Sequence, residues 1–378
     1  MMQKGFIYLD NAATSFPKPK SVIKAVNECM RKYCANPSRS THKLAMLAAE
    51  KVYLTREALA EFLNFDSPEQ IVFTLNATYA LNIAIKTSLA PQSHCLISDL
   101  EHNSVLRPIN KLAKQGIVSY SVFDTDGDIK SNIKSKITAD TKAIICTLTS
   151  NVTGKRIPLE ILSELKREYG LKLIVDASQE IGHRKIDLRK TPVDVLCAPA
   201  HKALFGISGL GFAVFCDKKT RESFIEGGSG FDSQNPDMPS LYPEIFEAGT
   251  LPLPAICALY EGIKFLNSYG IFEVEQKIKA LSDTVYDTLC KVGCNPIYCG
   301  DGGIVSFGMG NIPSSIISSE LNTSGIYIRS GLHCAPLVHN KLHTEKLGLA
   351  RISLSVLNKP SLCDKLYLAL KEIKSCYL

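Results

Sequence analysis

Lys202 and Asp176 are the side chains whose types and positions most favour chemistry on a bound cofactor. Lys202 lies in a turn between two short apolar runs, residues 193–198 and 212–215, which have the length and composition of buried strands. Partial burial lowers the pKa of a lysine. Lys202 is therefore either a cation at the edge of a pocket or an amine that forms a Schiff base with an aldehyde.

Asp176 is an acid that, like Lys202, lies at the end of a predicted buried strand. It ends the apolar run 173–175, and a carboxylate at the carboxyl end of a buried strand usually faces a ligand crevice. Enzymes that use pyridoxal phosphate pair their Schiff-base lysine with an acid that keeps the pyridine nitrogen protonated. The pairing favours the Schiff-base alternative, and a pyridoxal 5'-phosphate cofactor is the hypothesis to be tested against the rest of the chain.

Polar residues follow two other predicted strands in the same way. After the strand-like run 71–73, Asn76 and Thr78 open a helix, where free backbone N–H groups and the helix dipole favour a phosphate. The alternative is that Asn76 or Thr78 is only an N-cap. His102 follows the run 95–98, and its ring could stack on a flat cofactor.

Three polar loops are further candidates for ligand contacts. Residues 150–154 follow the predicted strand 143–148 and offer side chains to a carboxylate or a ring hydroxyl. Residues 11–14 combine small side chains with donors, and the alternative there is a plain helix start. In the irregular segment 226–254, rich in Gly, Ser and Pro, Thr250 could present its hydroxyl to a phosphate across a subunit boundary.

Cys334 lies in a polar loop directly after the predicted strand 326–328, beside His333 and near Arg329. Positive neighbours lower the pKa of a thiol, so the residue types favour a reactive thiol and a buried structural cysteine about equally. Arg351 interrupts another strand-like run. It would either form a bidentate pair with a substrate carboxylate or lie on a solvated strand face.

Composition excludes several classes of protein. The chain has 378 residues with 45% hydrophobic and 21% charged side chains, which suits a globular protein of two domains that share a crevice. The formal charge of +6 comes from scattered lysines, so nucleic-acid binding gains no support. No apolar run has transmembrane length and no signal-peptide core precedes the first strand, so we expect a cytoplasmic protein that binds no membrane.

The thirteen cysteines are odd in number and irregular in spacing, which argues against a disulfide framework. Cys290, Cys294 and Cys299 lack the paired spacing and the histidine partners of a zinc site, so we expect no bound metal. Most of the others, such as Cys146 and Cys197, lie in apolar runs and are expected to fill the core.

Short strands alternate with helices from about residue 70 to 215. This order is typical of a parallel α/β sheet with right-handed crossovers. After about residue 255 the pattern becomes α+β. Because the candidate site residues fall just past the carboxyl ends of strands, we expect them to meet at one edge of the large sheet.

The order of these segments resembles a known family over nearly the whole chain. The matching motifs are YLDNAATSFPKP, FTLNATYALN, EHNSVLRP, TSNVTG, VDASQEIGH, HK, FEAGT, RSGLHCAPL and ARISLS. They resemble those of the cysteine desulfurases in the class V aminotransferase superfamily, which are fold-type I pyridoxal phosphate enzymes. The sequence departs from the common pattern at Pro199, where many relatives carry Ser or Thr, and at Tyr79, where an acid is frequent.

The resemblance implies an α/β fold of the aminotransferase type. A large cofactor-binding domain, residues 16–255, would hold a mainly parallel sheet sandwiched by helices. A smaller α+β domain, residues 1–15 and 256–378, would carry the loop with Cys334. Two such chains would form a homodimer with shared sites.

The resemblance also assigns roles to individual residues. The catalytic residues would be Lys202, Cys334 and His102. The cofactor would contact Ala77, Thr78, His102, Asp176, Gln179, His201, Lys202 and, from the neighbouring subunit, Thr250. The substrate would contact Asn11, Asn151, Arg329 and Arg351.

The implied reaction converts L-cysteine to L-alanine and leaves the sulfur on Cys334 as a persulfide. A sulfur-acceptor protein would then take it for Fe–S cluster or other sulfur-containing biosynthesis. One alternative is a selenocysteine lyase with the same residues. Another is a class V aminotransferase or lyase in which Cys334 is incidental, and a third is a scaffold without activity.

Overall fold

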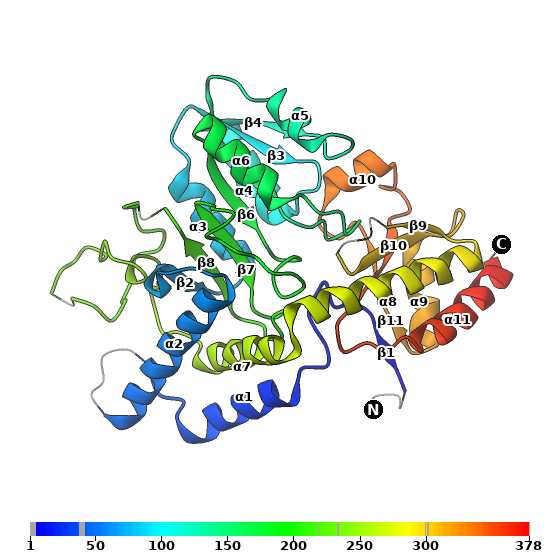
Figure 1. The fold of residues 1–378 in the computed structure, drawn as a ribbon, viewed down its shortest axis with the longest axis horizontal. Coiled ribbons are helices and arrows are strands. Elements are labelled where there is room, and N and C mark those ends of the chain that lie inside the picture. Colours follow the sequence, from blue (N-terminus) through cyan, green and yellow to red (C-terminus); the bar gives the residue numbers. More distant parts are fainter. Residues whose placement is uncertain are drawn as a thin grey trace.

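The computed structural model describes residues 5–37, 42–217, 219–232, 234–298, 300 and 302–377. Residues 38–41, in a basic loop that could order over a substrate, and Cys299 lie outside these ranges. Figure 1 shows two lobes side by side, each built on its own sheet, with the long helix α8 (Ile271–Val292) starting where they meet and running along the second lobe. Among the described residues, no helix combines the length and the apolar character needed to cross a membrane.

The large lobe contains a seven-stranded sheet. In spatial order its strands are β2 (Ile71–Thr74), β8 (Gly211–Phe215), β7 (Val195–Pro199), β6 (Lys172–Asp176), β5 (Thr141–Thr147), β3 (Ser93–Ser98) and β4 (Val118–Phe123). The pairs from β7 to β4 are parallel, and β8 runs antiparallel to both of its neighbours. This mainly parallel sheet confirms the predicted fold class. The predicted strands are confirmed as well, whereas β4 was not predicted.

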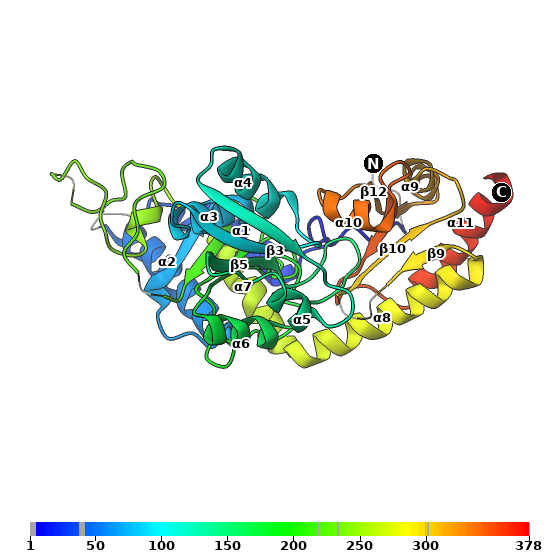
Figure 2. The same cartoon turned by 90° about the horizontal axis from the view of Figure 1, so that it is seen from above.

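Helices cover both faces of this sheet (Figure 2). They are α1 (Lys20–Lys32), α2 (Lys43–Phe62), α3 (Ala77–Ser88), α4 (Asn103–Lys114), α5 (Ile129–Lys134), α6 (Leu159–Tyr169) and α7 (Leu253–Tyr269). Successive strand residues alternate between two apolar clusters: Leu173 packs on the side of α6, and Ile174 packs on the side of α3 and α4. Because both faces are buried, the central strands are apolar along their whole length.

The second lobe holds a four-stranded antiparallel sheet. Its strands are β12 (Arg329–Gly331), β13 (Leu349–Ser353), β10 (Ile304–Gly308) and β9 (Asn295–Ile297). The helices beside it are α9 (Ser314–Thr323), α10 (Pro336–Leu342) and α11 (Leu362–Tyr377). A separate pair joins β1 (Ile7–Tyr8) in parallel to β11 (Ile326–Tyr327), so the amino-terminal strand pairs with a strand from far along the chain.

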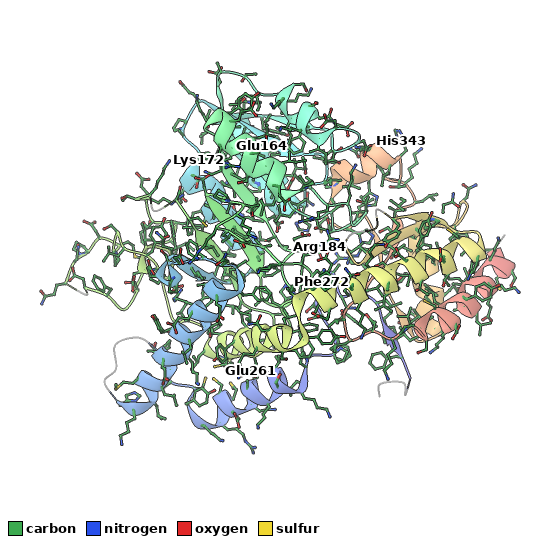
Figure 3. The ribbon with its side chains drawn as sticks, in the orientation of Figure 1. Glu164, Lys172, Arg184, Glu261, Phe272 and His343 are labelled. Carbon is green, nitrogen blue, oxygen red and sulfur yellow. The ribbon has the colours of Figure 1, made fainter. Side chains whose placement is uncertain are left out.

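Several contacts connect the lobes. Arg184, labelled near the middle of Figure 3, forms an ion pair of 2.9 Å between its Nε and Oε1 of Glu275 at the start of α8. Within the large lobe, helix α7 packs against α1 and α2, although most of α7 lies beyond the predicted boundary at residue 255. The domain boundaries at residues 15 and 255 stay predictions.

The irregular segment 226–254 is anchored at its end. It contains one short 3₁₀ helix, η2 (Glu244–Phe246), and another, η1 (Pro68–Gln70), precedes β2. Directly after η2, Glu247 is buried against Arg56 of α2, with Nη2 and Oε2 2.7 Å apart. This ion pair fixes the chain shortly before Thr250.

Candidate active site

A cavity opens at the carboxyl edge of the seven-stranded sheet. It is lined by Asn76, Ala77, Thr78, His102, Ser104, Thr147, Asn151, Asp176, Ser178, Gln179, Pro199, His201 and Lys202. These residues lie at or just beyond the ends of β2, β3, β5, β6 and β7. The structure therefore brings eight of the predicted site residues into one cavity, where strand ends in a parallel sheet gather polar groups.

Lys202 follows β7 in a tight turn. The backbone N–H of Phe205 donates to its carbonyl at 2.9 Å, and the hydroxyl of Ser15 donates to the same oxygen at 2.8 Å. Burial lowers the pKa of Lys202 to about 8, and the charge of Asp176 opposes this shift while those of Arg351 and Arg329 add to it. A substantial share of the amine is therefore neutral near pH 8, which is the form that attacks a carbonyl.

Asp176 ends β6 and is buried. Its Oδ1 accepts a hydrogen bond of 2.9 Å from the backbone N–H of Ser178. Its neighbour Gln179 is buried too and donates from Nε2 to the carbonyl of Ala12 at 3.0 Å. Both side chains are thus fixed in orientation in the cavity lining, as a ring-binding site requires.

His102 is a neutral imidazole in this site. It caps α4, and the backbone N–H of Ser104 donates to its Nδ1 at 3.0 Å, so the ring proton resides on Nε2. Burial lowers the pKa of His102 to about 4; the charge of Asp176 opposes the shift, and Lys202 and Arg329 add to it. A neutral ring is suited to stacking on a flat cofactor, which was its predicted role.

The start of α3 forms one wall of the cavity. Asn76 is its N-cap, with Oδ1 accepting from the N–H of Tyr79 at 3.1 Å, and it also lines the cavity. Ala77 and Thr78 then occupy the first turn, where backbone N–H groups have no partner within the helix. A Cβ on Gly211 would lie 2.4 Å from the carbonyl carbon of Asn76, so only glycine allows β8 this close to the helix start.

His201 and Lys18 add polar groups near that wall. The Nδ1 atom of His201 is buried and has no hydrogen-bond partner among the described residues. Burial lowers the pKa of His201 to about 4, with further lowering by Lys202 and Lys18. Lys18 donates to the carbonyl of His201 at 2.8 Å. Lys18 was not predicted, although its position in the motif SFPKP was visible in the sequence.

Arg351 is almost fully enclosed, which excludes the alternative of a solvated strand face. Its Nη2 lies 2.7 Å from Oδ1 of Asp10, and its Nη1 donates to the carbonyl of Asn151 at 3.0 Å. Its Nε is buried and has no partner within the part of the chain described. The predictions missed Asp10, whose only sequence signal was its place in the motif LDNAAT.

The other predicted substrate residues lie around Arg351. Arg329 is exposed on β12 and stands directly opposite Arg351 in the antiparallel register, so the two side chains share one face. The amide of Asn11 donates to the carbonyl of Ser353 at 2.9 Å, and that of Asn151 donates to the carbonyl of His333 at 2.7 Å. Residues 11–14 precede α1 by several residues, so they do not form its start.

Cys334 is exposed, which excludes the alternative of a buried structural cysteine. His333 and Cys334 both have left-handed backbone conformations, with φ of 49° and 58°. The carbonyl of Cys334 accepts from the N–H of Asn103 at 2.8 Å, so the loop is attached next to His102. Cys334 does not itself line the cavity.

His333 is not the cation that the residue types suggested. Its Nε2 lies 3.0 Å from the carbonyl of Leu349 and must donate to it, which leaves Nδ1 as an acceptor. Burial and the nearby charge of Arg351 lower the pKa of His333 to about 3. The positive charge near the Cys334 loop therefore comes from the arginines.

Thr250 was predicted but lies away from the cavity, and Glu101 was not predicted but lies beside it. Thr250 is exposed and does not line the cavity of its own chain. Glu101 is fully buried next to His102 and accepts from the N–H of Thr147 at 3.0 Å. Burial raises the pKa of Glu101 to about 8, with hydrogen bonds from Ser98 and Thr147 opposing the shift. Its only sequence signal was its position in the motif EHNSV.

Comparison with known proteins agrees with this geometry. The family model described as Aminotransferase class-V matches residues 7–366. A probable cysteine desulfurase of Methanothermobacter thermautotrophicus is 30% identical, with 97% of this chain and 94% of that protein aligned. Another, from Halalkalibacterium halodurans, is 29% identical over 98% of this chain and 94% of its own length.

A solved structure extends the comparison to the fold. The apo structure of a cysteine desulfurase from Thermococcus onnurineus NA1 superposes with a TM-score of 0.91 and 26% identity, covering 98% of this chain and 95% of the other. The match spans both lobes. By its sequence and its fold, the chain belongs to the class-V aminotransferase family.

Proposed function

We propose that this protein is a pyridoxal phosphate-dependent cysteine desulfurase, which converts L-cysteine to L-alanine and transfers the sulfur to Cys334. The observation that carries the proposal is the arrangement of Lys202, Asp176 and the Cys334 loop around one cavity. A buried lysine with a lowered pKa, Lys202, shares a cavity with Asp176, and the loop that presents the exposed Cys334 is bonded to the rim of that cavity. The curated relatives named above carry the same activity in their names.

The residues of the cavity fit pyridoxal phosphate. The first turn of α3 provides backbone N–H donors for a phosphate, and Nδ1 of His201, which has no partner among the described residues, lies nearby. Asp176 supplies the carboxylate for the pyridine nitrogen, and the neutral His102 and the amide of Gln179 are available for the ring. When bound, the cofactor supplies an aldehyde for amines and an electron sink for the carbon that loses a proton.

Arg351 is proposed to bind the substrate carboxylate. Its guanidinium is enclosed and already paired with Asp10 at one Nη atom, while its Nε lacks a partner among the described residues. A carboxylate that pairs bidentately with such a fork is held with defined geometry. Asn151, Asn11 and Arg329 are proposed to complete this side of the site. Lys202 is proposed to act as the general base and acid that takes the Cα proton and returns it.

Cys334 is proposed to act as the sulfur acceptor. Its thiolate forms an S–S bond with the substrate sulfur while the Cβ–S bond breaks. The electron pair of that bond stays with the three-carbon product, which is protonated to alanine. Cys334 is left as a persulfide, and an acceptor protein takes its outer sulfur by thiol exchange. The exposure of Cys334 supports access by such a partner.

The assembly is proposed to be a homodimer in the cytoplasm. Thr250 is exposed in its own chain, which supports the idea that its hydroxyl reaches the phosphate of a second copy. The twelve described cysteines are all free thiols, which suits a reducing compartment. The sulfur would enter Fe–S cluster or other sulfur-containing biosynthesis.

The test compares two exposed cysteines. Purified protein with pyridoxal phosphate, L-cysteine and a reductant should yield alanine and sulfide in equal amounts. Cys334→Ala should lower both rates at least about 100-fold, because the nucleophile is lost. Cys376→Ala, on α11, removes another exposed thiol and should leave both rates unchanged.

The alternatives predict different results. An aminotransferase that does not use Cys334 would keep its rate in Cys334→Ala and would transfer the amino group to a 2-oxo acid, which would refute the proposal. A selenocysteine lyase would be recognised in competition experiments, because selenocysteine would be consumed in strong preference to cysteine.

A further inference from the structure

Helix α10 follows the Cys334 loop directly and lies between the two lobes (Figure 1). His343, labelled in Figure 3, marks the end of this helix. Lys341 lies in its last turn and reaches the large lobe. Its Nζ is 2.6 Å from Oδ2 of Asp99, 2.6 Å from Oδ1 of Asp124 and 2.8 Å from Oδ2 of Asp126.

The three carboxylates belong to the carboxyl edge of the seven-stranded sheet. Asp99 directly follows β3, whereas Asp124 and Asp126 follow β4. Asp99 is buried, and its Oδ1 accepts from the hydroxyl of Thr125 at 2.7 Å. Lys155 approaches the same group from the large lobe, with Nζ 2.5 Å from Oδ1 of Asp126.

This group contains three negative and two positive charges. Burial disfavours the charge of Lys341, but hydrogen bonds to Asp124, Asp126 and Asp99 outweigh that cost and raise its pKa above the usual value. Hydrogen bonds from Lys341 also lower the pKa of Asp124. Without Lys341, three carboxylates would face one lysine, and their mutual repulsion would act on the surface that α10 covers.

Other contacts join the same segment to the cavity rim. The amide of Asn151 donates to the carbonyl of His333 at 2.7 Å. The backbone N–H of Asn103 donates to the carbonyl of Cys334 at 2.8 Å. Leu337 of α10 packs against the apolar cluster between α3 and α4. These contacts lie in the loop and at the start of the helix, whereas the three ion pairs lie in its last turn.

We propose that Lys341 is a positioning residue, whose ion pairs with Asp99, Asp124 and Asp126 hold α10 against the large sheet and so keep the Cys334 thiol at the rim of the cavity. The inference rests on the proposed function for its effect on turnover. Its effect on the placement of Cys334 is independent of that function. A displacement of a reacting group by about 1 Å can cost up to about 100-fold in rate.

The experiment measures the thiol and the turnover separately in the full-length holoenzyme. Lys341→Met should lower kcat for sulfide release about 10-fold or more, with little change in KM and in cofactor absorbance, because the cavity itself is unchanged. Alkylation of Cys334 by iodoacetamide, followed by peptide mass spectrometry, should become several-fold faster. The exposed Cys376 provides the internal reference for reagent and exposure time.

Lys155→Met is the matched control. It removes the other lysine of the same charged group but leaves the attachment of α10, so kcat and Cys334 alkylation should stay near those of the wild type. Lys341→Arg should restore most of both values, since a guanidinium can span the same carboxylates. If Lys341→Met does not fold, Asp124→Asn, at an exposed aspartate, weakens the same attachment and should shift both readouts in the same direction.

Two outcomes would overturn the inference. In one, Lys341→Met leaves both kcat and Cys334 alkylation unchanged. In the other, Lys155→Met reproduces its effects, which would mean that general loss of charge balance is responsible. If Cys334→Ala shows that the thiol is not used, the proposed function fails, but the alkylation rates still decide whether Lys341 positions the loop.

Discussion

The ion pair between Arg56 and Glu247 provides a sharp test of how this fold is held together. Both side chains are 7% exposed, and two hydrogen bonds join them, with Nη1 to Oε1 at 2.9 Å and Nη2 to Oε2 at 2.7 Å. Arg56 also donates to the carbonyl of Ile71, and its guanidinium lies 4.6 Å from the centre of the Phe73 ring. The pair fastens the segment before Thr250 to α2 and β2.

We expect Arg56→Met to lower the free energy of unfolding by about 3–5 kcal/mol, because removal of one partner leaves a buried charge without compensation. Methionine retains most of the apolar contact of the arginine stem. Glu247 would keep only the N–H of Phe73, at 2.6 Å, as a donor. Burial already raises the pKa of Glu247 against the opposing effect of Arg56, so the variant should take up a proton there.

Urea unfolding at fixed protein concentration measures the loss. Arg189→Met is the control, because it removes an equally direct contact with Asp66 that is exposed to solvent, and it should leave the free energy of unfolding unchanged. The double variant Arg56→Met with Glu247→Gln should be more stable than Arg56→Met alone, since no buried charge remains. A loss in Arg56→Met no larger than that in Arg189→Met would refute this reasoning.

Two further predictions concern the cavity. The pKa of Lys202 is about 8 in the folded protein and 10.5 as its ordinary value. Between these two pH values the unfolded chain binds a proton at Lys202 and the folded protein does not, so the free energy of unfolding decreases as the pH falls from about 10.5 to about 8. The apoprotein should lose stability over that range, Lys202→Met should remove this dependence, and unfolding in urea at several pH values checks it. Gly211→Ala would place a Cβ 2.4 Å from the carbonyl carbon of Asn76, so it should displace the start of α3 and weaken cofactor binding by about 10-fold or more. Absorbance titration measures the affinity, and Gly308→Ala, with no atom within 4 Å of its added Cβ, should retain it.

Most of the large sheet was predictable, because its strands are buried on both faces and read as continuous apolar runs. The strand β4 was missed because it lacks such a continuous apolar run. Its sequence VSYSVF alternates apolar and small polar residues, and it occupies the edge of the sheet, where only one neighbour covers it. A search for apolar runs finds strands with a continuous apolar sequence, including the edge strand β2 (Ile71–Thr74), and overlooks a strand of alternating character such as β4.

The candidate site was predictable where a residue follows its own strand. Lys202, Asp176 and His102 could be found because the carboxyl ends of parallel strands meet at one edge whatever the details of packing. Arg351 was found from its interruption of an apolar run, but its pairing with Asp10 was not. That pair joins a residue near the amino terminus to one near the carboxyl terminus, and the spacing of residue types carries no information on such contacts.

The sequence by itself determined the fold class, the edge of the sheet where the candidate site residues gather, and the types of group present there, since strand burial and chain order follow from local patterns. Only the tertiary structure decided the charge and the placement of those groups. It made His333 neutral through burial, set Arg329 opposite Arg351 through strand register, and joined α10, which follows the Cys334 loop, to the large lobe through Lys341. These outcomes depend on desolvation and on contacts between distant segments, and both exist only once the chain has folded.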